Sequence, residues 1–175
     1  LARPTNRTRR AAASGIGHTA GMPSDHRLRP ATRGDEPFLT RMLGHAANWR
    51  EGMSNPVKLH YVEGFGRPGD VGVIAEVAGE PAGAAWCRLL TGSDRGYGYV
   101  ADDVPELTIA VVPEHRGRGL ATALIEALKS AIAEAGYRAV SLSVEPDNPA
   151  RRIYERARFV RCGTEGGSWT MIADL

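Results

Sequence analysis

A short apolar segment that leads through a glycine-rich loop into a long amphipathic helix constrains the fold of this chain more than any other feature. Residues 107–112 read LTIAVV, a composition typical of a buried strand. Beyond the loop, apolar residues recur at helical spacing from Leu120 to Ala135, and Gly136 is a residue type that commonly ends a helix. A buried strand joined to an amphipathic helix predicts an α/β protein in which the helix covers a sheet.

The rest of the chain fits the same plan. Helices are predicted where apolar residues recur at helical spacing or follow a cap and a proline, and strands where β-branched and apolar residues cluster between turns. We expect one domain over residues 26–175, built on a single mixed sheet of the α/β or α+β class. The predicted strands cover residues 26–30, 71–77, 82–90, 107–112, 139–144, 159–161 and 169–172. The predicted helices run from Asp35 to about Gly44, from Asn55-Pro56 to Val62, from 120 to 135, and from Asn148-Pro149 through Tyr154.

The composition excludes several classes of protein. The chain has 175 residues, of which 42% are apolar and 24% are charged, as in soluble globular domains. Its two cysteines, Cys87 and Cys162, belong to no cluster of cysteines and histidines, so we expect no metal site. No apolar run approaches the roughly 18 residues that span a bilayer, and no signal sequence is recognisable. We therefore expect a cytoplasmic protein without a membrane partner.

Charge is distributed unevenly along the chain. Residues 1–33 contain seven arginines and one acidic residue, Asp25, so this segment carries +6 and the remainder carries −4 of the total of +2. Residues 1–21 show no helical or strand periodicity, and we expect residues 1–25 to form a disordered, arginine-rich leader. Its arginines are not interleaved with aromatic residues, which makes it a weak nucleic-acid arm, and we expect no nucleic-acid partner.

The loop between the strand and the helix has the features of an anion site. Gly117 and Gly119 allow a ligand to approach the backbone closely. The first turn of the following helix offers unpaired N–H groups at the positive end of the helix dipole. Arg116 and Arg118 add positive charge suited to phosphate. The loop therefore predicts a ligand that carries phosphate groups.

Two well-known phosphate-binding loops fit less well. A Walker loop is excluded, because its lysine and hydroxyl residue are missing here. A Rossmann dinucleotide site stays open as an alternative, with Thr122 in the place of its third glycine and Glu145 as a ribose-binding acid.

Two segments resemble motifs of the GNAT N-acetyltransferase superfamily. Arg116-Gly-Arg-Gly-Leu-Ala121 resembles its pyrophosphate-binding motif, (Gln or Arg)-x-x-Gly-x-(Gly or Ala), and residues 107–112 resemble the cofactor strand ahead of it. Residues 148–159 resemble the signature NxxAxxxYxxxGF, in which Asn148, Tyr154 and Phe159 match the Asn, Tyr and Phe. Ala150 is shifted by one place from the usual Ala when counted from Asn148, and Arg158 replaces the usual Gly, so the local turn departs from the pattern. With residues 27–35, which are similar to the family's first strand and helix start, the resemblance spans residues 27–175.

The resemblance implies both a fold and an activity. The fold is a mixed, mostly antiparallel sheet of six to seven strands flanked by about four helices. The activity is that of an N-acetyltransferase with acetyl-CoA as cosubstrate, in which a primary amine attacks the thioester directly in a ternary complex. The resemblance assigns cofactor binding to Ile109, Ala110, Val111, Arg116, Gly117, Arg118, Gly119, Leu120, Ala121 and Asn148.

The implied reaction needs two proton transfers. Tyr154 matches the family's tyrosine and is the candidate that donates a proton to the leaving CoA thiolate. Glu106, at the start of the cofactor strand, is the candidate base, which accepts a proton through water or holds the cationic amine. Asp102 and Asp103 are close in sequence and are alternatives for that carboxylate. His115 is interpreted as a loop residue beside the phosphate rather than as a base.

The acceptor is expected to be a small-molecule amine or a peptide amine, and the protein is expected to form a homodimer. A CoA-binding regulatory module without catalysis stays open as an alternative from another class. The candidate acceptor residues are Asn48, Trp49, Arg50, Trp86, Arg88, Tyr97 and Tyr99, with His45 and His60 as further candidates.

Overall fold

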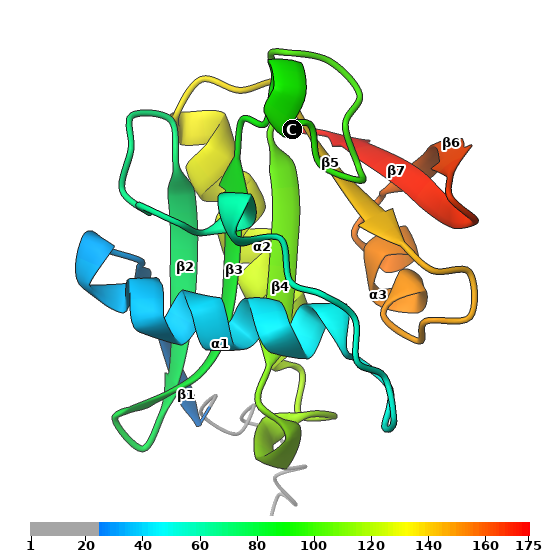
Figure 1. Cartoon of the computed structure of the whole chain (residues 1–175). Helices are drawn as coiled ribbons and strands as arrows, with labels where there is room; N and C mark the ends of the chain where they lie inside the picture. The colour runs from blue at the N-terminus through cyan, green and yellow to red at the C-terminus, as the bar shows by residue number, and fades with distance from the viewer. Residues whose placement is uncertain (1–24) are drawn as a thin grey trace, which may run out of the picture.

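Seven strands form one sheet in the computed structural model, which describes residues 25–175 of the chain (Figure 1). Their order is β1-β2-β3-β4-β5-β7-β6, and every neighbouring pair is antiparallel except β4 and β5. The mostly antiparallel sheet predicted from the sequence is thus confirmed, and the parallel sheet of a Rossmann domain is excluded. The strands are β1 (His26–Pro30), β2 (Val71–Val77), β3 (Glu80–Arg88), β4 (Glu106–Val111), β5 (Ala139–Val144), β6 (Val160–Glu165) and β7 (Ser168–Asp174).

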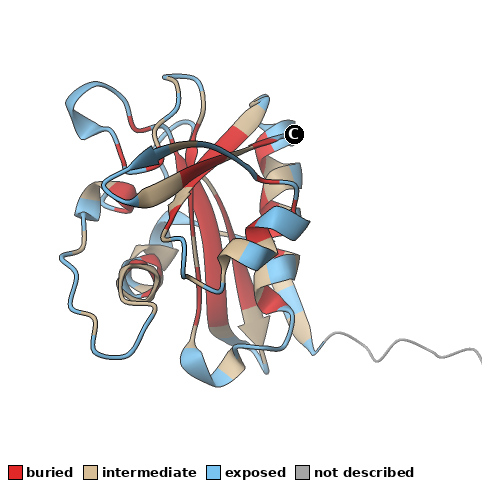
Figure 2. Cartoon of the chain, turned by 90° about the vertical axis from the view of Figure 1, so that its right-hand side faces the viewer, coloured by how far each residue is buried: buried red, intermediate tan, exposed pale blue. Residues whose placement is uncertain are grey.

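Helices cover both faces of the sheet. On one face, α1 (Glu36–Ala47) packs Leu39 and Met42 against Ile74 of β2. On the other, the apolar stripe of α2 (Leu120–Glu134) packs against alternate residues of β2 and β3, and α3 (Arg151–Arg156) adds Tyr154 to the same cluster. Because β3 is covered on both sides, its residues from 82 to 88 are all buried, whereas β6 at the sheet edge is mostly exposed (Figure 2).

The sheet opens between β4 and β5. The two strands pair through a single register pair, Glu106 with Ser141, and then diverge (Figure 1). From Leu107 onward, the edge of β4 that faces β5 therefore has no strand partner. This opening adjoins the glycine-rich loop, and the candidate site described below lies in it.

The prediction of a helix from Asn55 to Val62 is wrong. Residues 49–58 form no helix, and only a single 3-10 turn over Leu59–Tyr61 is present. Asn55 does not cap a following helix: its side chain donates to the Ala47 carbonyl (2.9 Å), and its amide donates to the Asn48 side chain (2.6 Å). The two asparagines thus fold the segment back onto the end of α1. As a result, the described residues contain three α-helices rather than about four.

The other boundaries differ by a few residues. Helix α1 runs past the predicted end at Gly44 to Ala47, because this glycine keeps a helical conformation. Strand β3 is shifted by two residues, and β6 and β7 are longer than predicted because a turn at Gly166-Gly167 joins them as a hairpin. The predicted leader lies outside the described residues apart from its last residue, and β1 begins at His26, where the predicted domain begins.

Candidate functional site

A cavity of about 860 Å³ lies in the opening between β4 and β5. Its walls come from β4, the glycine-rich loop and the start of α2, the end of β5, α3, and the segment from the end of α1 to Tyr61. The candidate acid, the candidate base and most of the candidate cofactor residues therefore line one continuous space. The lining includes Glu106, Ile109, Ala110, Val111, Arg116, Gly117, Gly119, Leu120, Ala121, Asn148 and Tyr154.

The glycine-rich loop presents a row of free backbone amides to this cavity. Gly117 and Gly119 both have a positive φ, and a β-carbon at either would meet no atom within 4 Å. The first bonded amide of α2 is that of Ala123, which donates to the Gly119 carbonyl at 3.1 Å. The amides of residues 117–122 have no partner among residues 25–175. Together with the positive end of the helix dipole they suit an anion.

The basic residues of the loop are placed differently from one another. Arg116 lines the cavity and donates through Nε to the Val111 carbonyl at 3.1 Å, which ties the loop to the end of β4. Arg118 is exposed and does not line the cavity, although its backbone amide is one of the free ones. His115 and His45 also line the cavity. Burial, with Arg116 and Arg41 nearby, lowers the pKa of His45.

The open edge of β4 supplies a second set of free backbone groups. The Val112 amide donates to the Ala82 carbonyl at 2.9 Å, so it faces β3. Because amides alternate in direction along a strand, those of Val111 and Ile109 face the opening instead. An extended ligand lying in the opening would meet them as an added strand would.

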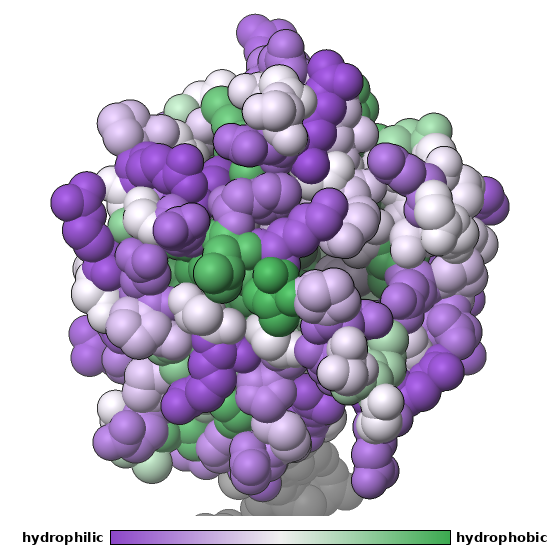
Figure 3. Space-filling view, in the orientation of Figure 1, coloured by the Kyte–Doolittle hydropathy of each residue, from purple (hydrophilic) through white to green (hydrophobic). Residues whose placement is uncertain are grey.

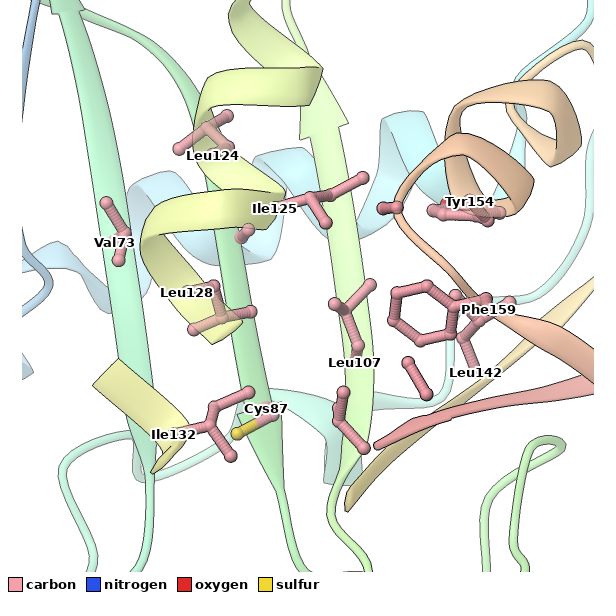
Figure 4. Close-up of a cluster of buried hydrophobic side chains, with 14 of the residues drawn as sticks. Val73, Cys87, Leu107, Leu124, Ile125, Leu128, Ile132, Leu142, Tyr154 and Phe159 are labelled. Atoms are coloured by element: carbon pink, nitrogen blue, oxygen red, sulfur yellow. The ribbon is translucent and has the colours of Figure 1, made fainter. Parts of the chain in front are cut away.

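A helix end positions Tyr154. The Phe159 amide donates to the Tyr154 carbonyl (3.0 Å) and the Arg158 amide to the Glu155 carbonyl (3.1 Å), which is the bonding pattern of a Schellman motif. Arg158 occupies its left-handed position with φ 67°, so the turn forms although the usual glycine is absent. The rings of Tyr154 and Phe159 pack edge to face with their centroids 5.9 Å apart, in the cluster drawn in Figure 4.

Tyr154 keeps its proton in the resting protein and can donate it during the reaction. Its side chain is buried but lines the cavity, and its hydroxyl has no hydrogen-bond partner among the described residues. Burial raises the pKa of the phenol, so the proton stays on the oxygen at neutral pH.

Glu106 is the buried carboxylate of the cavity. Its side chain is 3% exposed, with one oxygen, Oε1, hydrogen-bonded and the other, Oε2, without a partner in the described part of the chain. Burial raises the pKa of this carboxyl group, while the Gly98 amide, the Tyr61 hydroxyl and the Gly96 amide favour the ionised form and act against the rise. The alternatives Asp102 and Asp103 are exposed and do not line the cavity.

Asn148 begins the turn that leads into α3. Its side-chain oxygen accepts a hydrogen bond from the Ala150 amide at 2.9 Å, and its carbonyl accepts one from Arg151. The side-chain amide nitrogen is left available for a ligand, since it donates to none of the residues 25–175. Asn148 therefore both shapes the start of α3 and lines the cavity.

Two contacts join the acceptor side of the cavity to the end of β5. Trp49 donates through Nε1 to Glu145 at 2.6 Å, and Arg50 forms an exposed ion pair with Asp147. Trp49 and Glu145 both line the cavity. The segment after α1 is thus held across the opening, on the same side as Tyr97 and Lys58, whose ammonium group lies 3.7 Å from the Tyr97 ring centre.

The structure divides the predicted acceptor residues into two groups. Trp49, Tyr97 and His45 line the cavity. The predictions for Trp86 and Arg88 are wrong, because both side chains are buried behind the 59–63 turn. Trp86 donates to the Tyr61 carbonyl, and Arg88 is paired with Asp70. The remaining candidates, Asn48, Arg50, Tyr99 and His60, also lie outside the lining.

Sequence reasoning missed three parts of the site. Tyr61 donates to Glu106 at 2.9 Å, but the sequence placed it only within a predicted helix and gave it no role in the site. Gly96 and Gly98 lie against Glu106 and β5, in a segment for which the sequence predicted neither a strand nor a helix. The two glycines around an aromatic residue were the available signal for a close backbone approach.

The surface around α1 offers little apolar area. Figure 3 shows this face as mostly hydrophilic, with a small group of hydrophobic side chains near its centre. None of the helices in the described range is both long and apolar enough to cross a membrane. Within that range, His, Cys, Asp and Glu side chains form no group of three that would hold a metal ion. The cavity is thus the feature with the clearest chemistry.

Comparison with known proteins relates this site to one family. Residues 35–159 match the model of the Acetyltransferase (GNAT) family. The L-2,4-diaminobutyric acid acetyltransferase of Nocardia farcinica is 35% identical over 82 residues, which are 45% of this chain and 37% of that protein. The matches span 30–57% of the length of three curated relatives, so the chain covers less than two thirds of each.

Solved structures show the same fold. The GNAT domain of S. lividans PAT has a TM-score of 0.66 and 22% identity, over 86% of this chain and 90% of that one. A GNAT superfamily phosphinothricin acetyltransferase from Sinorhizobium meliloti, solved in complex with AcCoA, has a TM-score of 0.64 and 20% identity, over 86% and 89% of the two chains. At these identities the likeness is one of fold.

Proposed function

The chain belongs to the GNAT acetyltransferase family, and from this premise we propose that it transfers the acetyl group of acetyl-CoA to a primary amine. One observation carries the proposal. The open edge of β4 and the free amides of residues 117–122 meet in a single cavity with Glu106 and Tyr154. An extended arm with a phosphate group at one end and a reactive thioester at the other matches that arrangement.

The residues present fit acetyl-CoA as cosubstrate. The amides of residues 117–122 and the Arg116 side chain would hold the pyrophosphate, at the point where Gly117 and Gly119 leave open space. The backbone of Ile109 and Val111 would pair with the pantetheine arm, and Asn148 lines the wall opposite. Bound acetyl-CoA supplies a thioester that is activated toward an amine.

Glu106 serves as the base in this proposal. The acceptor enters as an ammonium ion and becomes a nucleophile only after losing a proton. The Glu106 carboxylate, whose side chain lines the cavity, is the group assigned to accept it, directly or through water. Because burial raises the pKa of Glu106, its basicity is closer to that required near neutral pH than that of an exposed glutamate.

Tyr154 serves as the acid. When the bond between the acetyl carbon and sulfur breaks, the sulfur leaves as a thiolate, and the Tyr154 hydroxyl donates a proton to it. A strand amide, that of Val111 or Ile109, donates to the carbonyl oxygen as negative charge develops there. The buried setting strengthens both interactions, since little water competes.

We assign the acceptor to a small-molecule or peptide amine. Trp49, Tyr61, Tyr97 and Lys58 frame the acceptor side, and this mix of aromatic and polar groups suits a polar amine. The relative from Nocardia farcinica is named for an amino acid that carries an amine. A homodimer and a cytoplasmic location are parts of the same proposal.

Replacing one hydroxyl group tests the assignment of the acid. An amine panel assayed with acetyl-CoA identifies an acceptor, and Tyr154→Phe is then compared with the intact protein. We expect turnover to fall about 10²-fold with little change in acetyl-CoA affinity, because the loss is in the transition state. Tyr137→Phe is the matched control, since that hydroxyl donates to the Gly69 carbonyl outside the cavity.

Other outcomes would contradict parts of the proposal. Full turnover by the Phe variant, with the chemical step shown to be rate-limiting, would mean that water protonates the thiolate. Loss of acetyl-CoA binding would make Tyr154 a packing residue. Binding of acetyl-CoA without transfer to any amine of the panel would favour the regulatory module over the enzyme.

A further inference from the structure

We propose that Tyr61 and the segment Gly96–Gly98 form a positioning cradle for Glu106, which fixes Oε1 by two hydrogen bonds and so orients the carboxylate for its role as the base. This inference rests on the proposed function, in which Glu106 is the base. None of the cradle residues is assigned a proton transfer of its own, so their role is to orient the carboxylate.

Two donors fix the first oxygen. The Tyr61 hydroxyl donates to Oε1 at 2.9 Å, and the Gly98 amide donates to the same oxygen at 2.6 Å. The Tyr97 amide in turn donates to the Tyr61 oxygen at 2.8 Å. Because the Tyr61 oxygen accepts a hydrogen bond from that amide, its own proton is directed toward Glu106. The bond is thus oriented by the backbone of the cradle.

The glycines of the cradle are required for space. Neither Gly96 nor Gly98 has a positive φ, so conformational freedom does not explain them. A β-carbon at Gly96 would overlap the Glu106 carboxylate and the Tyr61 hydroxyl. A β-carbon at Gly98 would lie 2.5 Å from the Leu142 carbonyl carbon on β5. The segment therefore passes between the carboxylate and β5 as bare backbone.

The turn that carries Tyr61 is anchored from behind. Trp86 donates to the Tyr61 carbonyl at 2.9 Å, and Arg88 donates to the carbonyls of His60 and Glu63, each at 2.9 Å. Arg88 is itself paired with Asp70 in an almost fully buried ion pair. The hydroxyl of Tyr61 is thus held on a rigid base, as positioning requires.

The second oxygen has a different environment. Oε2 of Glu106 is buried and has no hydrogen-bond partner in the described range, although the side chain lines the cavity. An unpaired buried carboxylate oxygen is costly, unless a ligand or water supplies a donor.

Few charged groups act on Glu106. Tyr61 faces it from the 59–61 turn, and the Glu165 carboxylate at the end of β6 acts as a like charge that raises the pKa. Arg88, its cross-strand neighbour on β3, turns its guanidinium to Asp70 instead. Tyr61 donates a side-chain hydrogen bond that favours the ionised carboxylate. Loss of its hydroxyl should therefore raise the pKa of Glu106.

The experiment is a direct titration of Glu106 in the full chain. Carbon-13 in the glutamate side-chain carboxyls reports each ionisation by NMR, and Glu106→Gln identifies the signal. Tyr61→Phe should raise the midpoint of Glu106 by about one pKa unit, because one hydrogen bond to the ionised form is lost. Tyr99→Phe is the matched control, since its hydroxyl also donates to a carboxylate, Asp102 (2.8 Å), but outside the cavity.

The titration does not depend on an acceptor, so it separates this inference from the proposed function. An unchanged Glu106 midpoint in Tyr61→Phe, with the protein folded, overturns the cradle. Once an acceptor is identified, the acid limb of kcat/KM should move upward by the same amount in Tyr61→Phe, with KM for acetyl-CoA unchanged. If the Glu106 midpoint shifted in the titration while the acid limb of kcat/KM did not, Glu106 would be held as described but would not be the base.

Discussion

Replacing Arg158 by glycine should make this protein more stable. Arg158 has φ 67° at the left-handed position that follows α3, forced there by the two hydrogen bonds that close the helix end. The same chain provides the comparison: α2 ends with an identical bonding pattern, in which Gly136 occupies this position with φ 92°. Arg158 is exposed, and its side chain makes no hydrogen bond or ion pair within residues 25–175.

The expected magnitude is a difference of two terms. A left-handed backbone costs a residue with a β-carbon about 1–2 kcal/mol. Glycine avoids this strain but loses about 0.5–1 kcal/mol more in backbone entropy on folding. Arg158→Gly should therefore raise the free energy of unfolding by about 0.5–1 kcal/mol. For a chain of this size, that corresponds to an increase in Tm of roughly 1–4 °C.

Thermal unfolding followed by circular dichroism, together with urea denaturation, measures the effect. Arg152→Gly is the matched control: it is the same exchange at an exposed site inside α3, and it should lower the stability by about 1 kcal/mol. Arg158→Ala should gain nothing, because alanine keeps the β-carbon. If Arg158→Gly were destabilised by as much as Arg152→Gly, the claim that the backbone of Arg158 is strained would be refuted.

Three further results are expected. Arg88→Met leaves Asp70 buried without its partner, and urea denaturation should show a loss of about 3–5 kcal/mol; a loss below 1 kcal/mol would contradict the buried pair as described. Because burial raises the pKa of Glu106 and a base must be ionised, kcat/KM should fall as the pH drops, with a midpoint above 4.5; a midpoint at or below that value would exclude Glu106 as the base. Burial raises the pKa of the Cys87 thiol to about 12, so iodoacetamide should modify the exposed Cys162 and spare Cys87 in the native protein, as mass spectrometry of the peptides would show.

Local sequence patterns predicted the strands well. Strand β2 and β5 have the predicted bounds, and β4 differs by one residue, because buried central strands are apolar at nearly every position. The end of α2 at Gly136 followed from a single residue with a clear conformational preference. These features depend on interactions within a few residues of one another.

The failures depend on contacts between distant segments. Asn55 looked like a helix cap, but its side chain bonds back to the end of α1, which no local pattern indicates. Tyr61 and Glu106 are 45 residues apart in sequence, and only the folded sheet brings them together. The opening between β4 and β5 is likewise a property of strand pairing and is not visible in the composition of either strand.

Binding of acetyl-CoA at the loop of Gly117 and Gly119 can be measured directly by isothermal titration calorimetry. The full chain should bind acetyl-CoA at one site, and Gly119→Glu should abolish binding, because the side chain brings bulk and negative charge to the free amides at the start of α2. Gly136→Glu is the matched control: it places the same side chain at a positive φ and in open space at the other end of α2, and it should bind acetyl-CoA as the intact chain does. Equal affinity in folded Gly119→Glu and Gly136→Glu proteins would contradict the assignment of the site.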